Sequence, residues 1–378
     1  MKLKHYTLII PVLLLCACSQ RKDEPVVAPW GTVNDTASAA GFDLNVIQQS
    51  GQMIILTLSG PETYYDYRGY RLGTHYTLCQ HFADSLGVSL RVELCKDTAE
   101  MLGRLASGDA DIIVYPLHPD SLWPGWVVDA EKPLLNEELH RWYTPARLDA
   151  ARNEMKQLLS RGTVKRRVYA PMLDKRGGII SRYDGLFVQY SRGISWDWRL
   201  MAAQCYQEST FDPQAVSWAG AKGLMQIMPG TADHLGLPRE KMFDPEQNIA
   251  AAARLLAELE RSFSEIRDRR ERQKFVLASY NGGSFHIRDA MALARRDGKN
   301  PHLWSDVSRY VLLLSQPEYY QDPLVKNGYM RGTETVDYVE KIQQRYDQYR
   351  GVRGPRPSAG ASLTPQKATN RAHRSKYQ

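Results

Sequence analysis

The chain has 378 residues, of which 43% are hydrophobic and 24% are charged. These proportions are typical of soluble globular domains and exclude a wholly disordered or fibrous protein. The formal net charge is +7, but two lysines near the start and six Lys or Arg in the last 28 residues account for eight positive charges. The remainder is nearly neutral, which argues against a nucleic-acid-binding domain, because such a domain needs a basic face on the fold itself.

The first 17 residues have the composition of a targeting segment. Lys2 and Lys4 precede an apolar run over residues 6–15, which is too short for a bilayer that needs about 20 residues. The run ends in Leu15-Cys-Ala-Cys18, which resembles a bacterial lipobox, where a signal peptidase cuts before the cysteine and the thiol is lipidated. We therefore expect Cys18 to carry a lipid anchor. The alternative is an ordinary secretory signal that is cut elsewhere.

Residues 18–50 predict a lipidated, flexible tether, because they contain Pro25, Pro29 and a run of Ser, Thr and Ala. No later stretch has about 18 consecutive apolar residues, so we expect lipid alone to hold the mature protein at the membrane, facing the periplasm. Ser19 beside the anchor favours the outer membrane, with the inner membrane as the alternative.

Residues 51–160 predict a small α/β lobe, and residues 161–189 a connector. Strand and helix patterns alternate along the lobe, which favours a parallel sheet covered on both faces. The expected strands are residues 53–58, 89–94 and 111–114, and the expected helices lie around residues 78–86 and 101–105.

Three stretches of this lobe, residues 63–69, 81–87 and 105–112, are similar to the first lobe of periplasmic amino-acid-binding receptors. They most resemble the version that is fused to the membrane-bound lytic murein transglycosylase F family. In that family a whole second lobe follows, but here residues 115–125 alone precede Trp126-Val-Val128, which is similar to the returning strand. We expect a single-lobed remnant that serves as a structural, docking or regulatory module, with cell-wall proteins as candidate partners. The alternative is a working solute receptor.

Residues 190–350 predict an all-helical domain with one unusual acid. An apolar stripe that includes Met201, Ala202 and Cys205 continues onto Glu208. A carboxylate on a core-facing stripe is unusual, because burying its charge is costly unless it is paired or protonated. Partial burial favours the protonated form that a general acid requires. The alternative is a helix-end glutamate that faces solvent.

Glu208 opens the first of four sequence blocks, at residues 208–213, 219–229, 278–283 and 334–342. In this order they resemble the soluble lytic transglycosylase domain, a goose-lysozyme-like helical fold that cleaves peptidoglycan. The resemblance implies that Glu208 protonates the oxygen of the β-1,4 bond between N-acetylmuramic acid and N-acetylglucosamine. The substrate-binding positions that it implies are Ser209, Gly223, Met225, Gln226, Tyr280, Asn281 and Tyr338. Instead of binding substrate, Ser209 could act only as a local helix cap. For Tyr280, Asn281 and Tyr338 the alternative to substrate binding is packing in the core.

The resemblance further implies a lyase reaction. Most glycosidases use two carboxylates, whereas the only acid in the 24 residues after Glu208 is Asp212, which precedes Pro213 and has the pattern of a turn acid. The substrate's N-acetyl carbonyl would support the cationic centre, and Glu208 would then take the proton of the C6 hydroxyl to leave a 1,6-anhydro end. The alternatives are a non-catalytic peptidoglycan-binding lipoprotein and a hydrolytic muramidase.

Motifs for other chemistries are absent from the sequence. There is no phosphate-binding loop, metal-binding helix or nucleophile elbow, so we expect no cofactor and no metal. Cys79, Cys95 and Cys205 lack metal-ligand spacing and are predicted to be buried apolar residues. Residues 351–378 predict a basic disordered tail, for which anionic lipids or peptide-stem carboxylates are candidate contacts and a solvated end is the alternative.

The predicted fold class is therefore multidomain α+β. A small α/β single lobe that resembles half of a periplasmic binding protein precedes an all-α, goose-lysozyme-like catalytic domain. The expected partners are peptidoglycan glycan strands and, through the anchor, a membrane.

Overall fold

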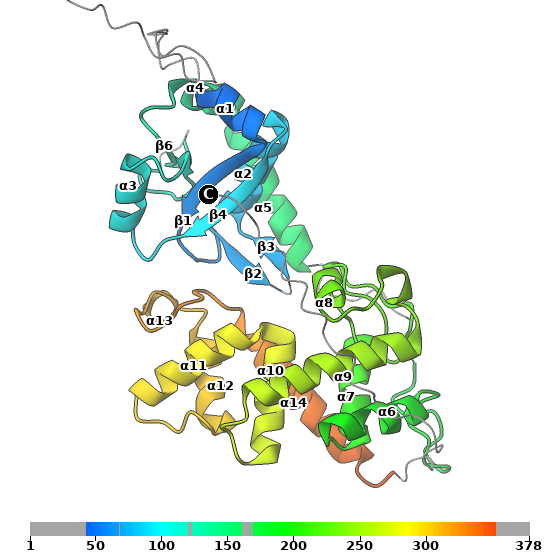
Figure 1. Cartoon of the computed structure of the whole chain (residues 1–378). Coiled ribbons are helices and arrows are strands. Elements are labelled where there is room, and N and C mark those ends of the chain that lie inside the picture. Colours follow the sequence, from blue (N-terminus) through cyan, green and yellow to red (C-terminus); the bar gives the residue numbers. More distant parts are fainter. Residues whose placement is uncertain (1–42, 68, 120–122, 161–166, 168, 353–378) are drawn as a thin grey trace, which may run out of the picture.

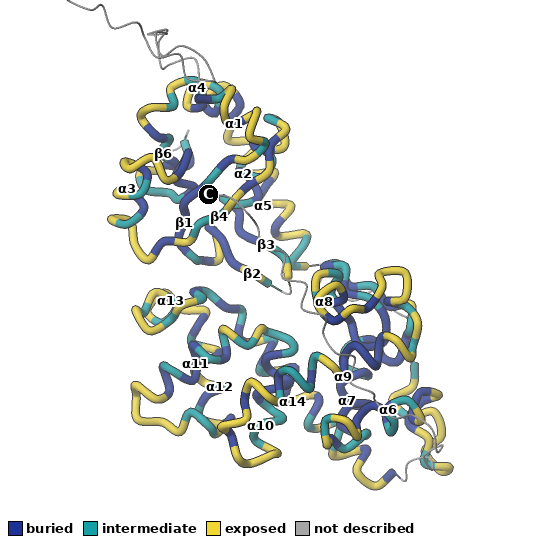
Figure 2. The backbone as a smooth tube through the Cα atoms, in the orientation of Figure 1, coloured by how far each residue is buried: buried dark blue, intermediate teal, exposed yellow. Residues whose placement is uncertain are grey.

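The computed structural model describes residues 43–67, 69–119, 123–160, 167 and 169–352. The targeting segment, Cys18 and the basic tail lie outside these residues. An α/β lobe lies against an all-helical domain (Figure 1), and buried residues gather inside each of the two units (Figure 2). Among the described residues, no helix is long and apolar enough to cross a bilayer.

The lobe is built around a four-stranded sheet in the order β4-β1-β5-β6. Its central strand, β1, pairs in parallel with β4 and β5, while β6 runs antiparallel to β5. The elements of the lobe are α1 (Asp43–Ser50), β1 (Gln52–Thr57), β2 (Tyr65–Tyr67), β3 (Tyr70–Leu72), α2 (Thr74–Leu86), β4 (Ser89–Leu94), α3 (Thr98–Ala106), β5 (Ile112–Ile113), β6 (Val127–Val128), α4 (Pro133–Trp142) and α5 (Pro145–Ser160).

Helices cover both faces of this sheet. Ile55 of β1 belongs to the same buried cluster as Phe82 of α2, whereas the next residue, Leu56, belongs to the cluster of Met101 on α3. Side chains alternate between the faces of a strand, so a parallel strand with helices on both sides buries successive residues, as Ile55 and Leu56 do in β1. The expected strands, helices and parallel pairing are confirmed.

Two boundaries differ from those expected. Residues 43–50, expected to belong to the tether, form α1, in which Asp43 and Ile47 are buried. Oδ2 of Asp43 accepts a hydrogen bond from the backbone N–H of Leu134 over 2.7 Å. Leu134 lies on α4, far away in the sequence, so the local sequence around Asp43 does not predict this contact. At the other end, α6 begins inside the expected connector of residues 161–189.

The helical domain packs around α7, which contacts α6 and α14, and around α10, which contacts α9, α11 and α14. The side chains of Asp197, Asp244 and Asp268 cap α7, α9 and α10 by accepting backbone hydrogen bonds in the first turn. The elements are α6 (Asp184–Ser191), η2 (Arg192–Ile194), α7 (Trp198–Ser209), α8 (Pro229–His234), η3 (Arg239–Lys241), α9 (Pro245–Ser262), α10 (Arg269–Gly282), α11 (Ser284–Arg296), α12 (Trp304–Leu313), α13 (Pro317–Tyr320) and α14 (Gly332–Tyr349).

The antiparallel hairpin β2–β3 reaches from the lobe to the helical domain (Figure 1). The ring of Tyr67 stacks on Trp218 with centroids 6.1 Å apart and an interplanar angle of 13°. The Tyr67 hydroxyl donates a hydrogen bond to Glu334 at the start of α14. The hairpin therefore contacts two segments of the helical domain that are far apart in the sequence. This hairpin was not among the elements expected from the sequence.

Candidate active site

Glu208 lies half-buried at the end of α7 and lines a small pocket of about 70 Å³. α7 ends there because Thr210 and Phe211 adopt positive φ angles of 50° and 63°, which turn the chain away from the helix. Among the described residues that line the pocket, Glu208 is the one carboxylate. The other lining residues are Ser217, Ala219, Ala221, Gln226, Met228, Tyr280 and Asn281.

Tyr338 of α14 holds the carboxylate of Glu208. Its hydroxyl donates a hydrogen bond to Oε1 of Glu208 over 2.5 Å and accepts one from Nε2 of Gln204 over 3.2 Å. Burial, together with the charge of Glu208, raises the pKa of Tyr338 well above its usual range, so the phenol stays protonated and acts as a donor. A chain of hydrogen bonds from Gln204 through Tyr338 thus orients Glu208.

Tyr280 and Asn281 enter the pocket from the end of α10. The Tyr280 hydroxyl donates to the backbone oxygen of Met225 over 2.7 Å, and burial raises the pKa of Tyr280 well above its usual range. Oδ1 of Asn281 accepts a hydrogen bond from Oγ1 of Thr335 over 2.9 Å. Both side chains are therefore fixed in place before any substrate binds.

Gln226 belongs to the loop between α7 and α8. Its backbone has a positive φ of 50°, and its Nε2 donates to the backbone oxygens of Gly223 and Ala215 over 2.8 and 3.1 Å. Its buried Oε1 has no hydrogen-bond partner in the described part of the chain. In the pocket lining, this oxygen can accept a hydrogen bond from a ligand hydroxyl or amide.

Two of the residues implied as substrate-binding lie behind the pocket. The structural reason for a glycine at Gly223 is packing, since a Cβ there would lie 2.4 Å from the backbone oxygen of Met242. The side chain of Met225 is fully buried, and its backbone N–H donates to Oδ1 of Asn248 over 2.8 Å. Neither residue lines the pocket.

Ser209 also lies away from the pocket. It is fully buried, and its hydroxyl donates to the backbone oxygen of Cys205 over 3.3 Å, which fits the alternative of a local helix-end role. Asp212 is a turn acid, as expected. Its carboxylate accepts hydrogen bonds from the backbone N–H groups of Arg167 and Gln214 over 2.6 and 3.0 Å.

Sequence reasoning missed Gln204, which supports Tyr338 from a fully buried position. The sequence does hold a signal for it, because an amide four residues before Glu208 lies on the same helix face. It also did not single out the remaining lining residues, which are Ser217, Ala219, Ala221 and Met228.

Comparison with known proteins relates this site to one family of domains. Residues 186–303 match the family described as the Transglycosylase SLT domain. The membrane-bound lytic murein transglycosylase F of Desulfosudis oleivorans is 45% identical over 168 residues, which are 44% of this chain and 36% of that protein. The protein of the same name from Shewanella loihica is 36% identical over 184 residues, which are 49% of this chain and 37% of that protein. In these matches the chain spans little more than a third of its relatives' length.

Two solved structures are also similar over part of the chain. The 70 kDa soluble lytic transglycosylase SLT70 of Escherichia coli is 26% identical and has a TM-score of 0.31, covering 45% of this chain and 24% of that one. An inactive mutant of the lytic transglycosylase Slt of Pseudomonas aeruginosa is 21% identical and has a TM-score of 0.35, covering 60% of this chain and 31% of that one.

Proposed function

We propose that this protein is a peptidoglycan lytic transglycosylase, a carbon–oxygen lyase. It cleaves the β-1,4 bond between N-acetylmuramic acid and N-acetylglucosamine and leaves 1,6-anhydro ends during cell-wall remodelling or turnover. The observation that carries the proposal is the 2.5 Å hydrogen bond from the buried phenol of Tyr338 to Glu208, the one carboxylate among the described residues of the pocket. The match of residues 186–303 to the Transglycosylase SLT domain supports it.

In the first step Glu208 acts as a general acid. The Tyr338 hydroxyl donates to Oε1, so the acid proton belongs on Oε2, from which it passes to the glycosidic oxygen as that oxygen leaves C1. The substrate's own N-acetyl carbonyl stabilises the cationic C1, which is why one protein carboxylate is enough. Gln226 and Asn281 bind the sugar amides and hydroxyls from the pocket lining.

In the second step Glu208, now a carboxylate, acts as a base. It takes the proton of the C6 hydroxyl of N-acetylmuramic acid, and the C6 oxygen bonds to C1 to close the anhydro ring. No water is consumed, and Glu208 ends protonated by the C6 hydroxyl proton, which replaces the proton that left with the glycosidic oxygen. Tyr338 keeps donating to Oε1 through both steps, so the carboxyl group holds one orientation.

The N-terminal segment serves to place this domain at the cell wall. A lipid on Cys18 anchors the protein in the outer membrane, facing the periplasm, and the residues between the anchor and α1 form the tether. The α/β lobe is a remnant of a solute-binding domain that lacks its second lobe. The direct antiparallel pairing of β5 with β6 supports this view, because few residues remain between them to form a lobe.

The proposal is tested by digesting purified peptidoglycan with the full-length protein and with Glu208→Gln, and weighing the products by mass spectrometry. Anhydro-muropeptides from the wild type alone are the expected result. Products heavier by one water would identify a hydrolytic muramidase. Binding without products from either protein would identify a non-catalytic peptidoglycan-binding lipoprotein.

A further inference from the structure

A second, larger cavity of about 630 Å³ lies where the α/β lobe meets the helical domain, and we call it the junction cavity. The lobe contributes Asp66, Gly69 and Leu94 to its lining, and the helical domain contributes residues from α8 to α11 and the loop before α14. Met228, Tyr280 and Asn281 line both this cavity and the pocket of Glu208. The two spaces therefore adjoin.

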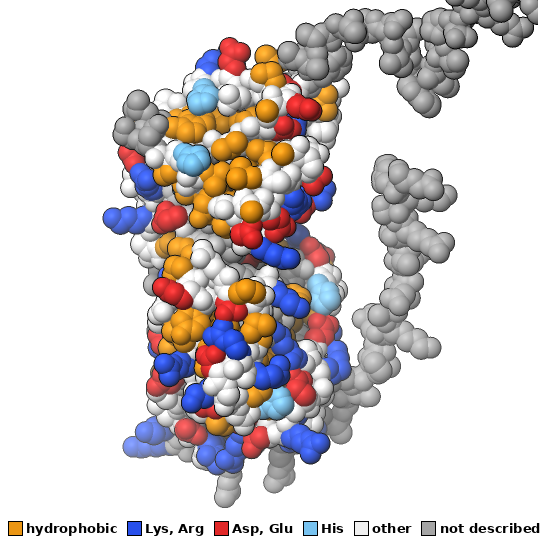
Figure 3. Space-filling view, turned by 90° about the vertical axis from the view of Figure 1, so that its left-hand side faces the viewer, with side chains coloured by type: hydrophobic (Ala, Val, Ile, Leu, Met, Phe, Trp, Pro, Cys, Tyr) orange, Lys and Arg blue, Asp and Glu red, His pale blue; other side chains and the backbone are white. Residues whose placement is uncertain are grey.

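The lobe side of the junction cavity is held firmly in place. Besides the contacts of Tyr67 with Trp218 and Glu334, the guanidinium of Arg331 lies 5.3 Å from the centre of the Tyr67 ring. A Cβ on Gly69 would lie 3.3 Å from Cε of Met228, so the end of the hairpin rests on the rim of the catalytic pocket. Figure 3 shows the lobe lying directly on the helical domain.

Charged side chains of both signs line the junction cavity. Asp66 comes from the hairpin. Burial lowers the pKa of His286 on α11, and the negative charges of Asp289 and, to a smaller extent, Asp66 act in the opposite direction. Lys326 comes from the opposite unit, on a loop fixed by the buried carboxylate of Asp289, which accepts hydrogen bonds from the backbone N–H groups of Lys326 and Asn327 over 3.1 and 2.9 Å. One anionic and one cationic group thus face the same space.

The remaining lining suits a peptide better than a sugar chain. Leu94 and Phe285 are 43% and 72% exposed, and they offer apolar contacts to aliphatic side chains. Ser279 is 5% exposed, and its hydroxyl has no hydrogen-bond partner within the described residues, so it can bond a ligand amide. The volume lies within the range of small-molecule sites, roughly 300–1,000 Å³.

We propose that the junction cavity binds the peptide stem of the strand whose glycosidic bond lies at Glu208. This inference rests on the proposed function. The stem is attached to N-acetylmuramic acid, the sugar whose C1 bond breaks, so it starts beside the catalytic pocket. It carries carboxylates and, where the third residue is a diamino acid, an amine. Asp66 of the lobe binds the amine and Lys326 of the helical domain binds a carboxylate, so the junction cavity selects stems by charge.

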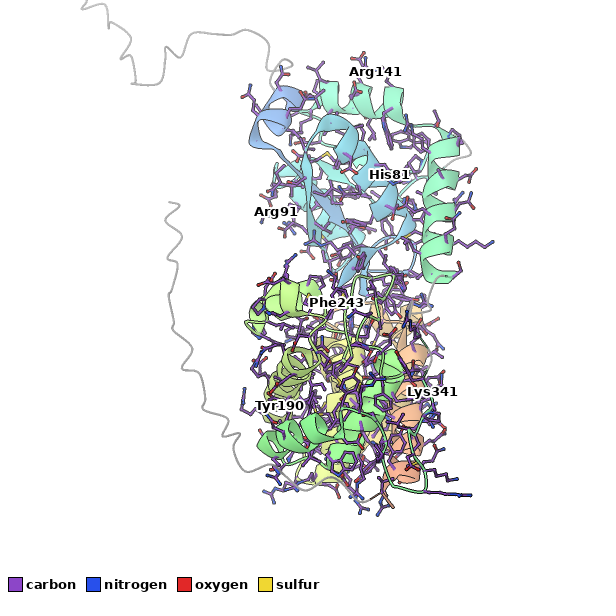
Figure 4. All side chains as sticks on the ribbon, turned by 90° about the vertical axis from the view of Figure 1, so that its right-hand side faces the viewer. His81, Arg91, Arg141, Tyr190, Phe243 and Lys341 are labelled. Atoms are coloured by element: carbon purple, nitrogen blue, oxygen red, sulfur yellow. The ribbon has the colours of Figure 1, made fainter. Side chains whose placement is uncertain are left out.

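The test compares two substrates: intact glycan strands with stems, and the same strands after an amidase has removed the stems. The readout is the ratio of kcat/KM for the two substrates, measured with full-length protein. We expect Asp66→Asn and Lys326→Met each to lower this ratio about 3- to 10-fold through KM. Asp84→Asn and Lys341→Met serve as matched controls that keep the wild-type ratio. Both side chains are exposed and outside the cavity, and Lys341 lies on the outer side of α14 (Figure 4).

A binding measurement separates this inference from the proposed function. Calorimetric titration of Glu208→Gln with the tetrapeptide L-alanyl-D-glutamyl-diaminopimelyl-D-alanine needs no turnover. Binding that Asp66→Asn weakens supports the junction cavity even if no anhydro products form. An unchanged kcat/KM ratio in both variants of an active enzyme, or peptide binding that neither substitution weakens, would overturn the inference and leave the proposed function intact.

Discussion

Nε2 of Gln204 lies 3.2 Å from the phenol oxygen of Tyr338 and donates a hydrogen bond to it. Because this bond occupies a lone pair of the phenol, the hydroxyl hydrogen of Tyr338 is directed at Glu208, 2.5 Å away. Neither Gln204 nor Tyr338 has to touch the substrate to affect the reaction. Their shared task is to keep the carboxyl group of Glu208 in one orientation.

We therefore expect Tyr338→Phe to lower kcat on purified peptidoglycan about 10- to 100-fold, since a hydrogen bond to a charged group contributes about 1.5–3 kcal/mol. Gln204→Met removes only the supporting bond, and we expect a loss of about 2- to 10-fold. Initial rates of anhydro-muropeptide release measure both, with thermal unfolding as the control for folding. Wild-type kcat in Tyr338→Phe would show that the phenol does not orient the acid.

Gly223→Ala tests the packing behind the pocket. With φ at 79° and a Cβ 2.4 Å from the backbone oxygen of Met242, alanine has no room, and we expect a loss of more than about 3 kcal/mol in the free energy of unfolding. Gly236→Ala is the matched control, because its φ is 66° but no atom lies within 4 Å of the new Cβ. It should cost about 1–2 kcal/mol from backbone strain alone. Equal losses in urea denaturation would show that contact with Met242 does not matter.

His75 makes the stability of the lobe depend on pH. Burial, reinforced by Arg152 and opposed by Glu62, lowers the pKa of His75 to about 4, and its neutral Nδ1 accepts a hydrogen bond from Nε1 of Trp126 over 2.9 Å. The unfolded chain takes up this proton near pH 6.5. The stabilisation is therefore complete above about pH 6.5 and is lost as the pH falls towards 4, by at most about 3 kcal/mol.

The measurement is the free energy of unfolding of the wild type and of His75→Gln between pH 4 and 8. Glutamine can accept the bond from Trp126 but does not titrate. We expect the wild-type curve to fall more steeply with acid than the curve of the variant. Parallel curves would contradict the role of His75.

The thiols of Cys79, Cys95 and Cys205 are buried and unpaired, which confirms the sequence-based expectation. Burial raises the pKa of all three thiols, so little reactive thiolate forms at neutral pH. We expect a thiol reagent to leave these cysteines unmodified in the folded protein and to modify all of them in denaturant. Peptide mapping by mass spectrometry identifies each site, and rapid labelling of Cys205 without denaturant would show that the helix before Glu208 opens locally.

The sequence predicted the elements of the site better than their contacts. The apolar stripe on one helix drew attention to Glu208, and the four sequence blocks with their family resemblance singled it out. The structure brings Glu208 together with Gln226, Tyr280, Asn281 and Tyr338. The individual roles were harder to predict, because they depend on which atom meets which across segments far apart in the chain. Gly223 is an example, since the oxygen that requires a glycine there belongs to a later turn.

For the fold, too, the sequence predicted the elements better than the contacts between them. Periodicity located the strands of the lobe and their parallel pairing, since both follow from local pattern and connection length. The hairpin β2–β3 was missed because its two strands have three residues each, and the surface that Tyr67 covers lies on another unit.

The double contact of Tyr67 has a consequence for heat tolerance. Trp218 belongs to the loop that carries Gln226, and Glu334 begins the helix that carries Tyr338, so one hairpin spans the two sides of the catalytic pocket. If the lobe unfolds, the two sides of the pocket lose the contacts with Tyr67 that connect them. The distance between Gln226 and Tyr338 is then no longer fixed by the hairpin. The temperature at which catalysis fails is then set by the lobe as much as by the helical domain.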